Sequence, residues 1–225
     1  MQLKFSLTDE IKDIIIADVI LTVAFAFAFS GGLFGKNLAQ SILYFIPIAA
    51  IAVPLNFVLH ELMHKFTAQH YGAQARFRSS NNGLIITLFS GMFGFLLGMP
   101  GATYIYANSF TVKENGIVSL AGPAINMLIF LVFLGAGSVL SLGSYASHAI
   151  SYVIFISLFL AFFNMLPIFP LDGSKVLKWN PPIYLTFMAI LLVLLEYFTG
   201  VGIVYLGFIV LIALFMSTMS RMVLL

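Results

Sequence analysis

Residues 54 to 72 read P-L-N-F-V-L-H-E-L-M-H-K-F-T-A-Q-H-Y-G, and this stretch decides both the fold and the chemistry of the chain. It places the motif H-E-x-x-H at the end of a strongly apolar segment. On a helix, His60 and His64 lie one turn apart, about 6 Å along the axis, so both imidazoles can reach one tetrahedral metal ion. Glu61 lies beside them and can accept a proton from a water molecule at the metal, as in zinc peptidases.

The alternative interpretation of this motif is a polar helix end that merely lies at a membrane interface. His, Glu and His at membrane depth would be costly to insert unless they were paired or bound to a metal. Ionisable residues inside a membrane therefore indicate a functional site. The sequence favours a metal site at this position.

Composition places the chain among the polytopic membrane proteins. Hydrophobic residues make up 61% of the 225 residues, charged residues make up 8%, and the mean hydropathy is +1.09. In soluble domains about a quarter of the residues are charged. The chain contains no cysteine, which excludes a disulfide framework, a thiolate metal site and a cysteine nucleophile. Metal binding must therefore use histidine and carboxylate side chains.

The apolar segments predict an all-α polytopic protein with six transmembrane helices. The connections between them are short, so we treat residues 1–225 as one intramembrane domain without a soluble part. We expect a catalytic core at about 38–180 and flanking helices in 1–37 and 181–225. The predicted spans are about 14–34, 38 to the H-E-x-x-H motif, 117–140, 146–166, 183–199 and 203–223.

The segment 84–106, which follows the second span, does not fit an uninterrupted helix. It contains several glycines, breaks at G-M-P-G and continues as T-Y-I-Y. This pattern predicts a membrane-associated β-hairpin or a re-entrant segment that does not cross the bilayer. An edge strand at 84–88 or 103–106 would be able to bind an unwound substrate by β-strand addition.

Basic residues are distributed very unevenly about the six predicted spans. Only Lys36 falls on one side of the membrane, and the other nine fall on the opposite side. By the positive-inside rule, this asymmetry places both termini and the opening of the site on the cytoplasmic side of a cell membrane. A full crossing by 84–106 would spoil the asymmetry. The nine residues are Lys4, Lys12, Lys65, Arg76, Arg78, Lys113, Lys175, Lys178 and Arg221.

A zinc hydrolase needs a third protein ligand and an open fourth position. Among the eight acidic residues, only Asp172 lies at the cytoplasmic end of a different span, in the stretch N-M-L-P-I-F-P-L-D-G. Pro167 and Pro170 break that span, and irregular backbone at membrane depth is tolerated only where it is buried or lines a wet cavity. Asp172 is therefore the candidate third ligand, and a turn or helix cap beside Gly173 is the alternative.

Three motifs taken together resemble the site-2 protease family of intramembrane metalloproteases. They are H-E-L-M-H at 60–64, A-G-P-A-I-N at 121–126 and N-x-L-P-x-x-P-L-D-G at 164–173, and the resemblance covers roughly 57–175. It implies a three-helix catalytic core with zinc as cofactor. It further implies that the protein cleaves transmembrane segments of other proteins, often for regulated release of a membrane-tethered factor. The implied roles are zinc ligand for His60, His64 and Asp172, and catalytic base for Glu61.

The resemblance also bears on substrate recognition. Asn126 and Asn164 are amides at membrane depth, and the resemblance implies that they position substrate or the oxyanion. Helix–helix hydrogen bonding is an alternative of equal weight. Ser174 stands where many members of the family have a second glycine, and we expect no PDZ or CBS domain. Partners expected from this interpretation are transmembrane substrate proteins and the lipid bilayer, with no nucleic acid.

Two other classes of protein compete with this interpretation. A membrane-anchored zinc peptidase that acts on soluble or misfolded chains would require a hydrophilic catalytic domain and, usually, a glutamate as third ligand. A non-enzymatic metal-binding transporter would have no need for Glu61 and would require further paired polar groups along a path through the membrane. The outer half of the chain contains almost none.

Overall fold

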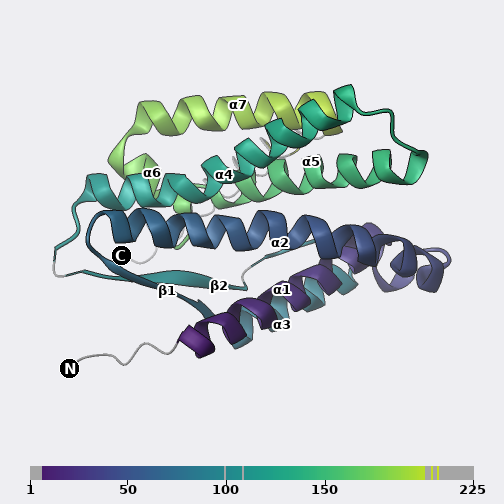
Figure 1. Cartoon of the computed structure of the whole chain (residues 1–225), viewed down its shortest axis with the longest axis horizontal. Helices are drawn as coiled ribbons and strands as arrows, with labels where there is room; N and C mark the ends of the chain where they lie inside the picture. Colours follow the sequence, from purple (N-terminus) through teal and green to yellow (C-terminus); the bar gives the residue numbers. More distant parts are fainter. Residues whose placement is uncertain (1–6, 99, 108, 201–203, 205–206, 208–225) are drawn as a thin grey trace, which may run out of the picture.

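The computed structural model describes residues 7–98, 100–107, 109–200, 204 and 207. Helices dominate, and the longest of them run side by side along the longest axis of the molecule (Figure 1). The elements in chain order are α1 (Leu7–Phe29), the 3₁₀ helix η1 (Gly32–Phe34), α2 (Leu38–His70), β1 (Gln74–Ser79), α3 (Asn81–Met92), β2 (Gly101–Tyr106), α4 (Val112–Val139), α5 (Ser144–Asn164), α6 (Asp172–Trp179) and α7 (Pro181–Thr199).

Four helices among the described residues are long and apolar enough to cross a membrane, namely α2, α4, α5 and α7. The predicted spans 117–140, 146–166 and 183–199 agree with α4, α5 and α7 within a few residues. The chain is therefore a mostly helical, multi-pass membrane protein with one small sheet.

Neither of the remaining two predicted spans is among these four helices. α1 covers most of 14–34 but begins at Leu7, and it carries Asp9, Glu10, Lys12, Asp13 and Asp18, so it is not among the four apolar helices. The span at 203–223 lies outside the described residues, apart from 204 and 207. The count of six crossings stays a prediction.

The prediction of a strand at 84–88 is wrong, because these residues belong to α3. The Ser80 side chain caps this helix by accepting a hydrogen bond from the Gly83 backbone N–H at 3.2 Å. Gly91 does not break the helix. It lies against α1, where an added Cβ would lie 2.5 Å from the Ala24 carbonyl oxygen. Glycine therefore allows α3 and α1 to pack backbone to backbone.

The predicted strand at 103–106 is confirmed as part of β2. β1 and β2 form a two-stranded antiparallel sheet, with Gln74 opposite Tyr106 and Ser79 opposite Gly101. The strands enclose α3 instead of forming a tight hairpin. Phe77 of β1 is buried and packs edge-to-face on Phe57 of α2, with ring centroids 5.5 Å apart. This contact attaches the sheet to the helix that carries the H-E-x-x-H motif.

α2 lies at the centre of the molecule, between α1 and α3 on one side and α4, α5 and α7 on the other (Figure 1). It packs against α1, α4 and α5. Small residues such as Ala49 and Ala52 are fully buried in it and permit these close approaches. α2 continues as one helix through Pro47 and Pro54.

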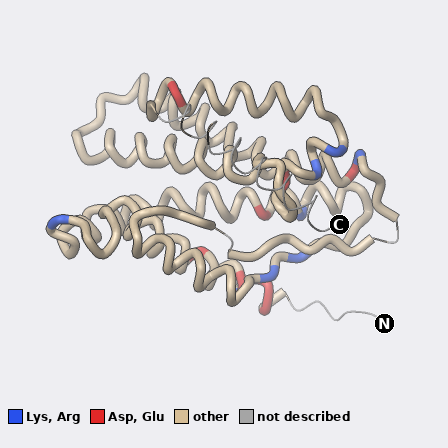
Figure 2. Tube along the Cα trace, turned by 180° about the vertical axis from the view of Figure 1, so that it is seen from behind, with Lys and Arg blue, Asp and Glu red and all other residues tan. Residues whose placement is uncertain are grey.

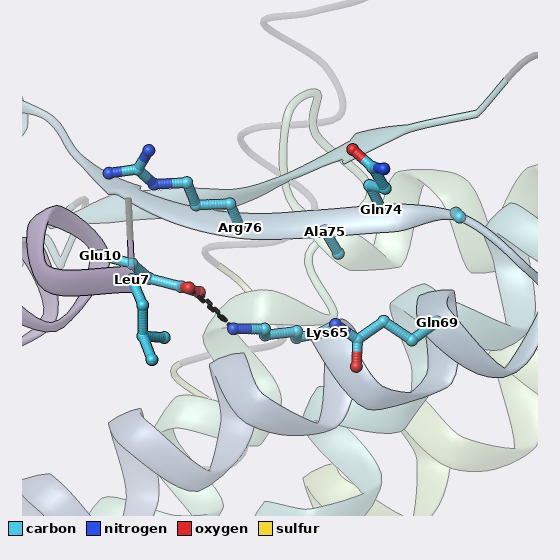
Figure 3. A pocket seen from close by; sticks show the side chains of 8 residues that line it. Leu7, Glu10, Lys65, Gln69, Gln74, Ala75 and Arg76 are labelled. Atoms are coloured by element: carbon cyan, nitrogen blue, oxygen red, sulfur yellow. Dashed lines mark hydrogen bonds and ion pairs between the residues drawn. The ribbon is translucent and has the colours of Figure 1, made fainter. Parts of the chain in front are cut away.

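Charged residues gather toward one end of the helices (Figure 2). At this end Glu10 of α1 joins three elements. Its carboxylate accepts hydrogen bonds from Lys65 Nζ of α2 at 2.7 and 2.9 Å, and from the backbone N–H of Phe77 in β1 at 3.2 Å. The Glu10–Lys65 pair lines a surface pocket of about 270 Å³ (Figure 3).

Candidate metal centre

Three side chains from two distant parts of the chain converge at one point. His60 and His64 come from α2, and Asp172 is the first residue of α6. The Nε2 atoms of the two histidines are 3.0 Å apart. Asp172 Oδ2 lies 3.3 Å from His60 Nε2 and 3.1 Å from His64 Nε2. Tetrahedral ligands held about 2.0–2.1 Å from zinc lie roughly 3.3 Å from one another. The three atoms are therefore spaced as the ligands of one zinc ion.

Hydrogen bonds on the far side of each imidazole orient both rings. His60 Nδ1 lies 2.6 Å from Asn126 Oδ1, and His64 Nδ1 lies 2.8 Å from the Val118 carbonyl oxygen. Both partners are acceptors, so in the neutral rings each Nδ1 carries the proton and each Nε2 presents its lone pair. Two nitrogen lone pairs and a carboxylate oxygen then point at the same place, which is the donor set of a cation site.

The hydrogen bonds of the Asn126 Nδ2 atom determine the orientation of the Asn126 amide. Asn126 Nδ2 donates to the carbonyl oxygen of Asn56 at 2.9 Å and to Asn56 Oδ1 at 3.0 Å. Asn56 Nδ2 in turn donates to the Ala52 carbonyl oxygen at 3.0 Å. Both asparagines are fully buried. This chain of hydrogen bonds leaves Asn126 Oδ1 as the acceptor for His60.

Gly122 of α4 provides the space in which the histidines meet. A Cβ at this position would lie 2.5 Å from His60 Nε2 and 2.5 Å from His64 Nε2. A glycine in an apolar helix generally allows two helices to approach closely. The structure shows a more specific reason, because any side chain at this position would occupy the volume beside the two metal-facing nitrogens.

The loop before α6 brings Asp172 to the histidines. Gly173 packs against this loop so tightly that an added Cβ would collide with the Met165 carbonyl oxygen. Burial by itself raises the pKa of Asp172, but when the imidazoles are protonated the charge of His64 and the hydrogen bonds from His64 and His60 outweigh it and hold the pKa well below its usual value. Lys175 Nζ lies 3.6 Å from Oδ1, the oxygen that does not face His64. Asp172 is thus an anion with Oδ2 directed at the histidines.

Glu61 lies next to this cluster and contacts the sheet. Its Oε2 accepts a hydrogen bond from the Thr103 hydroxyl of β2 at 2.6 Å. The side chain is only partly buried, in contrast to the two histidines. A partly exposed carboxylate with one oxygen held by a hydrogen bond is suited to proton transfer.

Six residues were singled out from the sequence. The structure brings four of them together, and Asn126 lies directly behind these four, which are His60, Glu61, His64 and Asp172. Asn164 differs, because its Nδ2 donates to the Leu160 carbonyl oxygen within α5 at 2.9 Å. Sequence reasoning missed Asn56 and Thr103. Asn56 lies one helical turn before His60, so a search for polar residues at intervals of four along α2 would have found it. No sequence signal pointed to Thr103.

Comparison with known proteins gives consistent results. The sequence profile described as "Peptidase family M50" matches residues 137–180. The chain is 43% identical over 176 residues to "Putative zinc metalloprotease MJ0611" of Methanocaldococcus jannaschii, covering 78% of this chain and 86% of that protein. It is 32% identical over 131 residues to "Putative zinc metalloprotease sll0528" of Synechocystis sp., covering 58% and 30% of the two chains. No solved structure matches the chain.

Apolar helices around a convergent His, His and carboxylate set define the class of the protein, which is a multi-pass membrane metalloprotease that uses zinc. More particularly, the chain belongs to peptidase family M50, the family of the site-2 proteases. The resemblance seen in the sequence motifs is thereby confirmed, as is the assignment of the protein as a hydrolase.

Proposed function

We propose that this protein is an intramembrane endopeptidase that hydrolyses peptide bonds within transmembrane segments of other proteins. One observation carries the proposal. The convergent histidines and the asparagine behind them lie on α2 and α4, two of the four helices that are apolar enough to cross a membrane. His60 and His64 are only 4% and 7% exposed, so the metal site would be reached from inside the helical bundle or from its cytoplasmic end.

We assign roles to the site residues as follows. His60, His64 and Asp172 would hold the zinc ion, which when bound polarises the scissile carbonyl and makes the attacking water more acidic. Glu61 takes the proton of the water at Oε1, because Oε2 already accepts the Thr103 hydroxyl. Glu61 then delivers that proton to the nitrogen of the leaving amine.

We assign different tasks to the two asparagines. Both ends of the Asn126 amide are engaged, by His60 and by Asn56, so this residue would act by holding His60 and not by touching substrate. Asn164 stands at the end of α5, just before the loop that leads to Asp172. It stays our candidate for substrate binding.

Binding of a transmembrane substrate requires its helix to unwind, because a peptide bond inside a helix is shielded and already hydrogen-bonded. The unwound stretch then needs backbone partners. β2 has β1 on only one side in the described sheet, and it carries the residue that contacts Glu61. We propose that substrate adds as a strand along the other edge of β2.

The proposed function also requires a particular arrangement of the helices in the membrane. We propose six crossings, formed by α1, α2, α4, α5, α7 and a last span at 203–223, with both termini and the opening of the site in the cytoplasm. α3 would not cross, since its 12 residues extend for only about 18 Å. Residues 1–225 would act as one domain, with the core at about 38–180.

The test is cleavage of synthetic transmembrane peptides by the purified protein in detergent micelles or vesicles. We expect cleavage within the apolar segment, loss of cleavage with a zinc chelator, and recovery when zinc is restored. Glu61→Gln should retain zinc and lose activity, whereas Asp172→Asn should lower zinc affinity by at least about 100-fold, since even residues behind the ligands contribute 10–100-fold. Cleavage of soluble, unstructured peptides alone would contradict the intramembrane function.

A further inference from the structure

We propose that Thr103 is a positioning residue for hydrolysis: its hydroxyl orients the Glu61 carboxylate and couples the register of strand β2 to the position of the proton acceptor. The inference rests on the proposed role of Glu61 and goes beyond it. It assigns a function in the reaction to a residue of the sheet, 42 positions away in sequence.

The hydrogen bond between the two side chains is short. Thr103 Oγ1 lies 2.6 Å from Glu61 Oε2, within the range of about 2.5–2.7 Å that is typical of a hydroxyl donating to a charged carboxylate. No other hydrogen bond to the Glu61 side chain is found in the described part of the chain. One contact therefore selects the rotamer of Glu61 and decides which of its two oxygens faces the histidines.

The sheet leaves Thr103 no freedom to turn away. Thr103 is directly opposite Phe77 in the antiparallel register, so the two side chains lie on the same face of the sheet. Phe77 is 1% exposed and packs against Phe57 of α2, which identifies this face as the one toward α2. A slip of one residue would present Ala102, which has no hydroxyl, or Tyr104, whose hydroxyl lies at the far end of a ring and not next to the strand.

The position of Thr103 on β2 would determine where a substrate is cut. A strand added along the free edge of β2 would have one residue opposite Thr103, and that residue would be the nearest to Glu61. The register of pairing would then select the peptide bond that meets the proton acceptor. The neighbours of Thr103 on the same face of β2 are Gly101 and Ile105, which would contact the substrate side chains two positions to either side.

A purely structural role for Thr103 would make different predictions. The hydroxyl would then serve only to hold β2 on α2, a task to which the buried Phe77–Phe57 contact already contributes. Loss of the hydroxyl would in that case weaken substrate binding or stability, and would leave the turnover of bound substrate unchanged. Separate measurement of kcat and KM distinguishes the two roles.

The experiment compares Thr103→Val, which keeps the shape and removes the hydroxyl, with Thr103→Ser, which restores the hydroxyl. For Thr103→Val we expect kcat to fall roughly 10- to 100-fold, the scale of a misplaced catalytic group, with KM within about twofold and zinc content unchanged. Thr103→Ser should recover most of the loss. Thr199→Val in α7 is the matched control, because the Thr199 hydroxyl donates within its own helix, to the Leu195 carbonyl oxygen, and activity should be unaffected.

A second measurement requires no substrate. Infrared difference spectra between the wild-type protein and Thr103→Val should show a shift of carboxylate stretching bands, which should be absent when both proteins carry Glu61→Gln. Undiminished kcat in Thr103→Val, equal impairment in Thr103→Ser, or absence of the band shift would each overturn the inference. If the wild-type protein cleaves only unstructured soluble peptides, the intramembrane function fails, and Thr103 is tested on those peptides by the same comparison.

Discussion

Gly122 illustrates how strongly the metal centre depends on a single missing side chain. Glycine inside a helix usually destabilises it by roughly 0.5–1 kcal/mol relative to alanine. At this position the absence of a side chain leaves room for the two histidines, because a Cβ atom would lie 2.5 Å from the Nε2 atom of each. α4 supplies the Val118 carbonyl and Asn126 to orient the same histidines, so one helix both shapes and orients the site.

We expect Gly122→Ala to reduce zinc content severely while the protein stays folded, because the new methyl group would lie 2.5 Å from the Nε2 atoms of both proposed histidine ligands. Gly135→Ala is the matched control, since it lies in the same helix and an added Cβ there meets nothing within 4 Å. This control should keep its zinc and gain about 0.4–1 kcal/mol of stability. Zinc content by elemental analysis checks both variants, and normal zinc in Gly122→Ala would refute the proposed geometry.

At the scale of the elements, the Glu10–Lys65 pair couples the first helix to the active-site helix and the sheet. The side chains of Glu10 and Lys65 are only 7% and 17% exposed. Glu10 also accepts the N–H of Phe77, the residue that attaches β1 to α2. Removal of the charge would leave a largely buried ammonium without its partner, which costs more than loss of a surface ion pair.

We therefore expect Glu10→Gln to lower the free energy of unfolding by about 1–3 kcal/mol, or the Tm by roughly 3–10 °C for a chain of this length. Zinc should be retained, because none of the three proposed ligands is changed. Arg78→Gln is the comparison, since Arg78 is 52% exposed and 3.9 Å from Asp13, and such a pair contributes less than about 1 kcal/mol. Thermal unfolding in detergent measures both, and equal losses would show that burial of the Glu10 pair has no special effect.

At the scale of the whole molecule, the charges decide how the bundle sits in a bilayer. Basic residues gather toward one end of the helices (Figure 2). Those of β1, α4 and α6 lie on elements near the H-E-x-x-H end of α2, whereas Lys36 comes two residues before the first residue of α2, at the other end of that helix. By the positive-inside rule, this distribution supports the proposed orientation, in which the metal site faces the cytoplasm. The same end holds the Glu10–Lys65 pair.

Single-cysteine labelling should therefore report the cytoplasm for Arg78→Cys and Lys178→Cys, and the opposite side for Lys36→Cys and Ser144→Cys. The natural chain has no cysteine, so each variant carries one reactive thiol. An impermeant maleimide applied to intact cells and to inside-out vesicles gives the answer. If Arg78 and Lys113 were labelled from opposite sides, the segment between them would cross the membrane and the six-span topology would be wrong.

The class of the protein and its candidate metal ligands in α2 could be predicted from the sequence. Composition indicates that the chain lies in a membrane, because a chain with 8% charged residues has too few of them to form a water-exposed surface. The motif around His60 and His64 is local, since helical periodicity alone puts the two rings on one face. The spans at α4, α5 and α7 are likewise visible as apolar runs of sufficient length.

The meeting of residues that are distant in sequence could be seen only in the folded molecule. The approach of Asp172 to His64, the volume left by Gly122 and the contact between Thr103 and Glu61 depend on helix packing and strand register. The error at 84–88 has the same origin: the glycines of α3 read as breaks in sequence, whereas in the fold Gly91 allows a close contact with α1. Local sequence patterns indicate the type of element and whether it faces water or lipid. The contacts between elements depend on the packing of the whole molecule.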